Sequence, residues 1–367
     1  MNYTVITGFS MKKRTIIAIL PLMALAALTA CGKTANGSAA AKIDPYYLTG
    51  TREDRENFTA LFTLLAREDN TPEGTFAVVR EIANSFARAK EYGRLIHFLD
   101  GRTINFPDDP YNSYYLLMIA YIYMQQDALP VAAQYFDLIV KNYPDLTVNG
   151  ESIHYACLNQ LINLSKYPVQ RVWYYQELIS RFSDRIDLGT AWFMLAQTYE
   201  QIGDWNSALQ AYTSYLPYAG AMIPGFPNAD SYARQQVTFN NSRKDWTFES
   251  LPSLITAVKD ALDAGSSWQL GRCQAKVNFF TRSWGQSDIE DFDVFVFNLS
   301  EFMHGNRIRY ADELDPSSNS TEAFLRTWGW HQYLSTWYLY FRKIYFPADP
   351  EIHGRWEWAG IYYGEKF

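Results

Sequence analysis

The chain has 367 residues, of which 17% are aromatic and 19% charged, and its formal net charge is −7 at pH 7. This acidic balance, without a basic run longer than that in residues 241–244 anywhere after residue 30, argues against nucleic acid as the main partner. Its 3 cysteines are too few for a disulfide framework.

The N-terminus has the layout of a secretory signal, with the predicted start at Met11. Basic residues 12–14 precede an apolar run over 16–30, which is too short and too interrupted by Pro21 to cross a bilayer as a mature helix. The run ends in LTAC, residues 28–31, where small residues suit a peptidase cleft and the cysteine offers a thiol. This stretch resembles the lipobox of bacterial lipoproteins.

The resemblance implies that residues 1–30 are a signal peptide and that Cys31 becomes the diacylated first residue. Two acyl chains anchor a protein more firmly than one. Gly32 stands where lipoproteins retained in the inner membrane carry Asp, so the outer membrane is favoured. Residues 31–53 are expected to form a flexible tether. The alternative is an ordinary signal peptide in which Cys31 is incidental.

From about residue 54 to 220, apolar residues recur at helical spacing between regular turn signals. One stretch places Ala120, Tyr123, Ala132, Phe136 and Pro144 at steps of three, nine, four and eight residues. The same steps connect Ala83, Phe86, Leu95, Leu99 and Pro107, and again Ala196, Tyr199, Ala208 and Tyr212. A degenerate copy holds Ile162, Tyr175 and Ser183, so about four units end at residues 107, 144, 183 and 220.

These steps resemble the tetratricopeptide (TPR) pattern. Two helices approach closely only where side chains are small, and aromatic residues then fill the space beside that contact. The resemblance implies a right-handed solenoid of helical hairpins over residues 54–220. The alternative is an unrelated helical bundle with chance spacing.

Residues 221–367 form the second predicted region, which is rich in aromatic residues. We expect a long connection after residue 220 and helices over 251–265, 268–284, 289–304 and 321–346. The tail from residue 354 alternates and is predicted as a small β-hairpin, and residues 293–300 are an alternative strand. The predicted fold class is therefore all-α, a TPR-like solenoid followed by a mainly helical C-terminal region.

Motifs for catalysis, metal binding or a cofactor are absent from the sequence. The five histidines lack metal-ligand spacing, so each is expected at the surface or in a cap. Cys157 and Cys273 are expected as buried free thiols, and a single disulfide between them is the alternative. The acidic run over residues 288–293 is interpreted as the first turn of a helix, not a cation site. We predict no cofactor, no metal and no enzyme activity. A cell-wall-acting enzyme using Asp291 or Glu301 is a minor alternative.

Eight of the eleven tryptophans lie in residues 246–367. The helix predicted over residues 321–346, which carries three of them, is apolar nearly all round, so it is expected to form the core of a C-terminal subdomain. The alternative is an aromatic platform for a sugar or a peptide. Its predicted aromatic residues are Trp328, Trp330, Trp337, Tyr338, Tyr340 and Tyr345.

TPR arrays bind proteins or peptides in a concave groove lined by the first helix of each unit. Carried onto this chain, the resemblance places ten residues on the groove: Arg80, Asn84, Tyr114, Leu117, Tyr121, Gln160, Asn163, Phe193, Gln197 and Glu200. The leading hypothesis is an envelope scaffold that is anchored through Cys31 and binds a protein partner. The stretch over residues 132–145 is similar to that in lipidated factors that assemble outer-membrane proteins. The second hypothesis is a solute- or glycan-binding lipoprotein, including one that serves a transporter.

Overall fold

A computed structural model describes residues 43–220, 222–284 and 297–366, and the chain divides into two compact units, residues 1–70 and 71–367. The predicted signal peptide and Cys31 lie outside the described residues. The described part of the first unit contains the 3-10 helix η2 (Pro45–Tyr47) and helix α1 (Arg52–Leu65). Because both begin before residue 54, the predicted tether extends too far along the chain.

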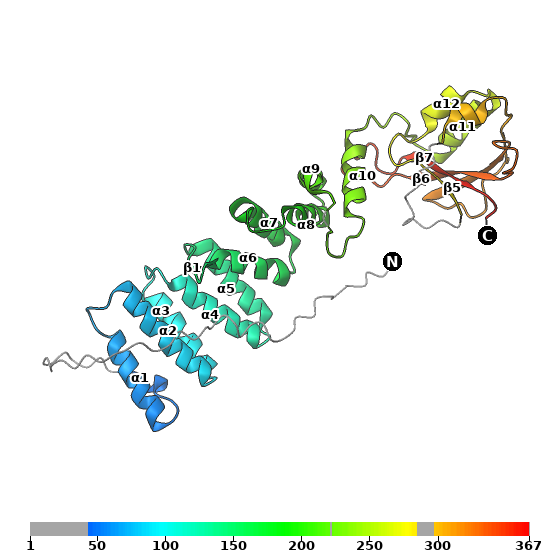
Figure 1. Ribbon diagram of the computed structural model, residues 1–367. Helices are drawn as coiled ribbons and strands as arrows, with labels where there is room; N and C mark the ends of the chain where they lie inside the picture. Colours follow the sequence, from blue (N-terminus) through cyan, green and yellow to red (C-terminus); the bar gives the residue numbers. More distant parts are fainter. Residues whose placement is uncertain (1–42, 221, 285–296, 367) are drawn as a thin grey trace. The chain divides into compact units, whose positions relative to one another are not determined.

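Within the described part of the second unit, helices α2 to α9 form adjacent packed pairs (Figure 1). The pairs are α2 (Pro72–Arg88) with α3 (Tyr92–Asn105), α4 (Asn112–Gln125) with α5 (Leu129–Asn142), α6 (Ile153–Leu164) with α7 (Pro168–Phe182), and α8 (Leu188–Gln201) with α9 (Trp205–Tyr215). The short strands β1 (Thr147–Val148) and β2 (Glu151–Ser152) connect α5 to α6, and the 3-10 helix η3 (Leu216–Tyr218) follows α9.

The small and bulky residues of the repeated pattern form the core of these pairs. Ala120 on α4 and Ala132 on α5 are fully buried, as expected for a close approach of two helices. The other pattern residues that are 1% exposed or less are Ala83, Phe86, Leu95, Leu99, Phe136, Ala196, Ala208 and Tyr212. The pattern therefore identified many of the side chains that the pairs bury, although Tyr123, Ile162 and Tyr199 are only partly buried.

Three of the four pairs turn in the same way. Lys90, Asp127 and Gly203 follow the first helix of their pairs with φ angles of 58°, 60° and 77°. In each turn the next residue donates its N–H to the carbonyl oxygen five residues earlier, at 2.9, 2.8 and 3.0 Å. This is the Schellman arrangement that ends a helix through one left-handed residue. The remaining turn, between α6 and α7, instead places Pro168 at the start of the second helix.

The predicted long connection after residue 220 contains a further helix, α10 (Ala229–Asn241). Its small residues Ala229 and Ala233 are buried in one cluster with Tyr215 of α9. This helix was not recognised in the sequence, because the residues that it buries in this cluster are alanines and give a weak hydrophobic period. The expectation of a long connection was wrong for these residues, because they form a helix.

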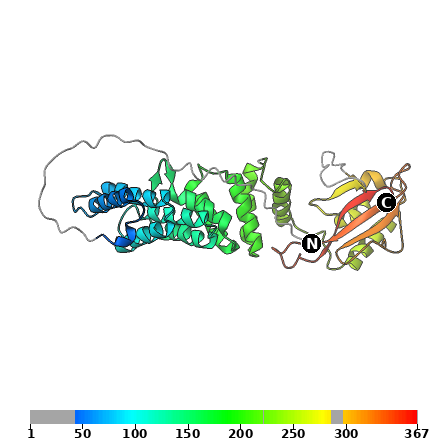
Figure 2. The same ribbon diagram turned by 90° about the horizontal axis from the view of Figure 1, so that it is seen from below.

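The C-terminal part of the second unit contains a five-stranded sheet, so the all-α prediction was wrong there. Its elements are α11 (Leu251–Asp263), α12 (Ser267–Cys273), β3 (Phe280–Ser283), α13 (Leu299–Met303), β4 (Arg309–Tyr310), β5 (Glu322–Trp328), β6 (Trp337–Lys343) and β7 (Trp356–Tyr363). The strand order is β3-β7-β6-β5-β4; β3 and β7 are parallel and the other pairs antiparallel. Figure 2 shows the orange and red strands against yellow helices.

The helix predicted over residues 321–346 consists of strands β5 and β6 and the loop between them. Leu339 and Phe341 join the core beneath α11, whereas Tyr338 and Tyr340 lie on the opposite face of the sheet. Because both faces are apolar, the alternation that identifies a strand is hidden.

The remaining C-terminal predictions have mixed outcomes. The helix over 251–265 is confirmed as α11, with Ser250 as its N-cap and Gly265 at φ 57°. The helix over 268–284 is wrong after Cys273, because β3 follows. The tail is one central strand, β7, and not a separate hairpin. A helix was predicted over residues 289–304, with a strand over 293–300 as the alternative. Residues 289–296 lie outside the described part, and residues 299–303 form the short helix α13.

Candidate functional site

The ten residues predicted for the groove all lie on the first helices of the pairs. Arg80 and Asn84 are on α2, and Gln160 and Asn163 are on α6. Tyr114, Leu117 and Tyr121 are on α4, and Phe193, Gln197 and Glu200 are on α8. We refer to this set as the first-helix face.

Phe193 is a correction to this set, because its side chain is only 1% exposed. Its ring packs edge-on against Tyr212, Tyr215 and Phe226 at centroid distances of 5.7, 5.2 and 5.2 Å. A ring enclosed in this way supports the fold and is not available to a partner. Arg80 and Asn163 are exposed, and the remaining seven residues are partly exposed.

At the α2 end of the face, Arg80 lies in an aromatic environment. Its guanidinium is 5.4 Å from the ring centroid of Phe76, and Phe76 is 5.1 Å from Tyr114 and stacks on Tyr111 at 4.2 Å. Burial raises the pKa of Tyr114, and the positive charge of Arg80 partly opposes that shift. No ion pair neutralises Arg80 among the described residues. This end can therefore bind a group that is both planar and anionic.

The middle of the face is polar and aromatic. The ring of Tyr121 packs edge-on against Phe136 at 5.6 Å, and burial raises the pKa of Tyr121 to about 12. The Asn163 amide donates to the Asn159 carbonyl oxygen at 2.9 Å. Nearer the α2 end, the Oδ1 atom of Asn84 is buried and has no hydrogen-bond partner. The middle therefore offers tyrosine and amide groups for neutral hydrogen bonding.

At the α8 end, Glu200 accepts hydrogen bonds from neutral groups. Tyr232 of α10 donates its hydroxyl to both carboxylate oxygens, at 2.9 and 3.2 Å, and Gln197 donates to one of them at 3.4 Å. Gln197 also bonds to the Tyr212 hydroxyl. Burial raises the pKa of Glu200, and the tyrosine hydroxyls oppose that rise. A half-buried carboxylate without a cation can attract a basic group.

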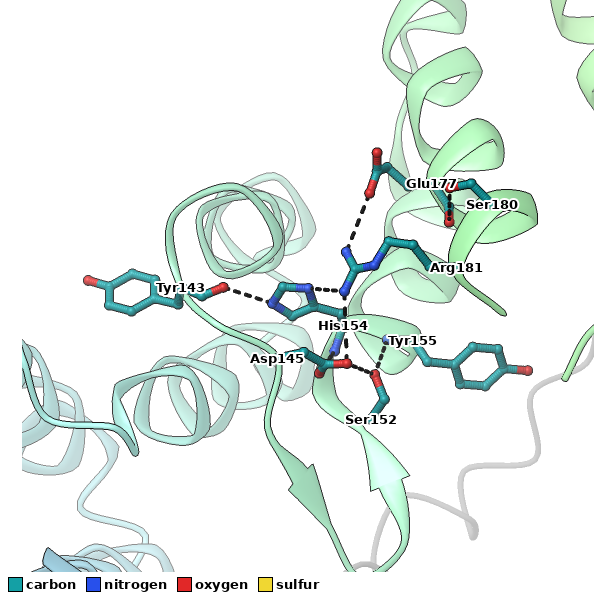
Figure 3. Close-up of polar contacts among 8 residues, drawn as sticks. All are labelled: Tyr143, Asp145, Ser152, His154, Tyr155, Glu177, Ser180 and Arg181. Atoms are coloured by element: carbon teal, nitrogen blue, oxygen red, sulfur yellow. Dashed lines mark hydrogen bonds and ion pairs between the residues drawn. The ribbon is translucent and has the colours of Figure 1, made fainter. Parts of the chain in front are cut away.

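A second polar cluster surrounds His154 at the junction of α5, α6 and α7 (Figure 3). Arg181 lies 2.8 Å from Nδ1 of His154, and Nε2 lies 3.0 Å from the Tyr143 carbonyl oxygen. A guanidinium only donates, so we assign Nδ1 as acceptor and Nε2–H as donor to Tyr143. His154 is buried and therefore not a surface histidine, but it bonds to the carbonyl oxygen of Tyr143, the C-cap residue of α5, as a capping histidine does; the other four histidines are exposed.

The carboxylate of Asp145 completes this cluster. It accepts from the Ser152 hydroxyl at 2.6 Å and from the His154 backbone N–H at 3.0 Å, and Arg181 lies 3.9 Å away. Burial is the main cause that lowers the pKa of His154; the charge of Arg181 adds to it and that of Asp145 opposes it. Because the polar groups are already paired with one another, the cluster fixes the start of α6 against α7 and offers no reactive group.

Most residues of the proposed aromatic platform lie in the core of the sheet region. Trp330 and Trp337 are 1% and 3% exposed, and Tyr338 and Tyr340 are also buried. Trp328 lies on β5 and Tyr345 follows β6; both remain exposed. The six side chains therefore do not share one exposed surface.

The cysteines and the acidic run complete the predicted sites. Cys157 and Cys273 are buried free thiols, as expected, and burial raises the pKa of Cys273 to about 11. The acidic run over 288–293 lies outside the described residues. Within the described ranges, no three His, Cys, Asp or Glu side chains are grouped as a metal site would require. Nor does any described helix combine the length and apolarity that crossing a membrane demands.

Comparison with known protein families found no matching family model, and comparison with curated proteins found no similar sequence.

Proposed function

We propose that the protein is a lipid-anchored scaffold of the bacterial cell envelope that binds a protein or peptide partner along the first-helix face. In this proposal the helix pairs form a right-handed TPR-like solenoid, and diacylglycerol on Cys31 holds it at the outer membrane. The partner is an extended segment, since the contacting residues are distributed over the first helices of four successive pairs.

The left-handed residues of the three Schellman turns carry the proposal. Lys90, Asp127 and Gly203 each follow the second residue of the repeated pattern, Phe86, Tyr123 or Tyr199, by four positions. Chance spacing in an unrelated bundle would give no reason for the same backbone conformation at the same position of each pair. Repeated use of one helix pair supports a stacked array, which presents equivalent helix faces along one side.

The charges of the face support a partner that binds in one direction. Arg80 at the α2 end and Glu200 at the α8 end have no ion-pair partner among the described residues. Tyr121 lies on the intervening helix α4, and partly exposed tyrosines frequently dominate binding energy at protein interfaces. An acidic group near α2 and a basic group near α8 would complement both ends.

Affinity capture tests the proposal. Detergent-solubilised membranes that contain the tagged chain should yield a stoichiometric protein partner, whose affinity is then measured with both proteins purified. Tyr121→Ala should weaken that affinity by roughly tenfold or more, and Glu200→Gln by less.

Gln210→Ala on the exposed side of α9 is the matched control for these substitutions. Phe193→Ala is unsuitable, since it would open a cavity in the core. Equal affinity of Tyr121→Ala, Glu200→Gln and the control would reject the first-helix face as the binding site.

The anchor has a separate test. Cys31→Ala should release the protein from the membrane fraction, and density-gradient separation of the wild-type chain should place it with the outer membrane. If Cys31→Ala stays with the membrane, the lipobox interpretation fails, whatever the outcome of the binding test.

No observation favours the solute- or glycan-binding hypothesis over the scaffold. Trp330 and Trp337, which that hypothesis would use, are core residues. Quenching of tryptophan fluorescence by a panel of sugars would reopen it.

A further inference from the structure

A hollow of about 400 Å³ lies between α3 and α5, the second helices of two successive pairs. Asp100 and Ile104 line it from α3, Leu116 from α4, and Gln134, Tyr135 and Leu138 from α5. Ile104 is 76% exposed and Leu138 is 36% exposed. The hollow therefore combines exposed aliphatic side chains with a single carboxylate.

A tyrosine–aspartate contact crosses this hollow and is repeated in the next pair of helices. The Tyr135 hydroxyl donates to the Asp100 carboxylate, with distances of 3.2 and 3.1 Å to its two oxygens. Between α5 and α7, the Tyr174 hydroxyl donates to Asp137 at 2.8 Å. Asp137 is 37 residues after Asp100, and Tyr174 is 39 residues after Tyr135, which match the spacings of the repeated units. The hollow between α3 and α5 is therefore equivalent to the space between α5 and α7. We call them the first valley and the second valley.

The chain fills the second valley with its own side chains. Lys141 forms an ion pair with Asp137 at 2.8 Å, and its Nζ lies 5.4 Å from the ring centroid of Trp173. The positions equivalent to Lys141 and Trp173 in the first valley are Ile104 and Gln134. The first valley thus lacks both the cation and the aromatic ring that occupy the second.

The absence of a cation leaves the Asp100 carboxylate uncompensated. No ion pair joins Asp100 to Lys, Arg or His among the described residues; its neighbour Arg102 instead pairs with Asp109 at 2.9 Å. A neutral tyrosine hydroxyl satisfies part of the hydrogen-bonding capacity of the carboxylate but none of its charge. The first valley therefore complements a cationic group that also carries apolar surface.

We propose that the hollow between α3 and α5 binds a partner segment that presents a basic side chain next to an aromatic or aliphatic one. The basic group pairs with Asp100 as Lys141 pairs with Asp137, and the apolar group covers Ile104 and Leu138. This surface belongs to the second helices, so it is separate from the first-helix face and does not depend on binding there.

Tryptamine and indole-3-propionate are suitable probes, because both carry an indole ring but the first adds an ammonium group and the second a carboxylate. They are titrated into the full chain with ¹³C-labelled isoleucine and leucine methyl groups. Tryptamine should shift the Ile104 and Leu138 methyl resonances in a saturable manner. Indole-3-propionate should bind at least about fivefold more weakly, as expected when one partly exposed ion pair is removed.

Two substitutions test the assignment from opposite directions. Asp100→Asn removes the charge but keeps an oxygen acceptor for Tyr135, and Ile104→Lys supplies the cation that the second valley already has. Both should weaken the response of Leu138 to tryptamine, whereas Asp137→Asn should leave it intact. Thermal unfolding checks that each variant is folded; if one is not, the other still decides.

Three results would overturn the proposal. The first is an equal response to both probes, and the second is a tryptamine affinity in Asp100→Asn equal to that of the wild-type chain. The third is a shift of the Leu138 methyl that depends on protein concentration without a probe, which would identify a second copy of this chain as the occupant.

Discussion

The helix pairs over residues 72–215 and the sheet region over 251–363 are both rich in aromatic residues, but their sequences reveal their structures to different extents. Most helices of the pairs, such as α3, α5 and α9, bury one stripe of side chains and keep exposed residues on the opposite side, so their period remains visible. Strands β5, β6 and β7 bury residues on both faces, so their period of two is lost. Hydrophobic periodicity therefore indicates structure only where one side stays polar.

The comparison also shows the value of repetition. Ala120, Ala132 and Phe136 would be weak evidence in a single unit, but equivalent residues in two more units fix the phase of the helices in those three units. No such repeat accompanies the strands. Their pairing joins segments far apart in sequence, as when Phe280 of β3 pairs with Gly360 of β7.

The largest expected effect tests the core of the sheet region. Trp358 on β7 is fully buried and packs edge-on against Phe279 at 5.2 Å. Trp358→Ala should lower the free energy of unfolding by about 3–5 kcal/mol, measured by urea denaturation followed by near-ultraviolet circular dichroism. Trp268→Ala, at a residue that is 70% exposed, should change it by less than about 0.5 kcal/mol. Similar losses for both variants would contradict the described sheet core.

The close helix contact of the paired region is tested by adding volume. Ala120→Leu should lower the free energy of unfolding by about 1–3 kcal/mol, because the adjacent helix α5 leaves no space for the added atoms. Gln125→Leu, at an exposed position of the same helix, is the control in chemical denaturation. An unchanged free energy of unfolding in Ala120→Leu would mean that α4 and α5 do not meet at this alanine.

The His154 cluster predicts that the free energy of unfolding depends on pH through a histidine of the helix pairs. Because the folded-state pKa of His154 is lowered, the folded chain binds fewer protons than the unfolded chain as pH falls below the ordinary histidine value of about 6.5. Its stabilising contribution is therefore present above that pH and lost below it, by at most about 1.4 kcal/mol per pH unit. Unfolding measured between pH 5 and 8 should show a reduced slope in His154→Gln.

His331→Gln, at an exposed histidine of the sheet region, is the matched control and should keep the wild-type slope. If His154→Gln and the wild-type chain have the same slope, the protonation of His154 is not coupled to folding.

The smallest expected effect tests the repeated turn. Lys90→Gly should raise the free energy of unfolding by up to about 1 kcal/mol, because glycine adopts a positive φ without the steric cost paid by lysine. Gly203→Ala at the equivalent position should lower it by about 1 kcal/mol. Thermal unfolding that shifts in the same direction for both variants would contradict the shared turn.

The sequence predicted part of the candidate site. The repeat placed nine partly or fully exposed residues on first helices, but it also included the buried Phe193. Helix position alone does not show that Tyr215 and Phe226 pack around this ring. Tyr232 was missed, since it lies on α10, which the alanine-rich stripe concealed. The tyrosine–aspartate contacts between second helices could have been found by aligning the units, where Asp100 and Asp137 coincide.

The sequence by itself determined the helix pairs, their turns and most of the side chains that they bury, since these depend on contacts between residues close along the chain. Tertiary structure decided the five-stranded sheet, the position of α10 and the open valley beside Asp100. These features depend on which distant segments meet, and a side chain's type does not specify whether a neighbour from another helix or strand will fill the space beside it.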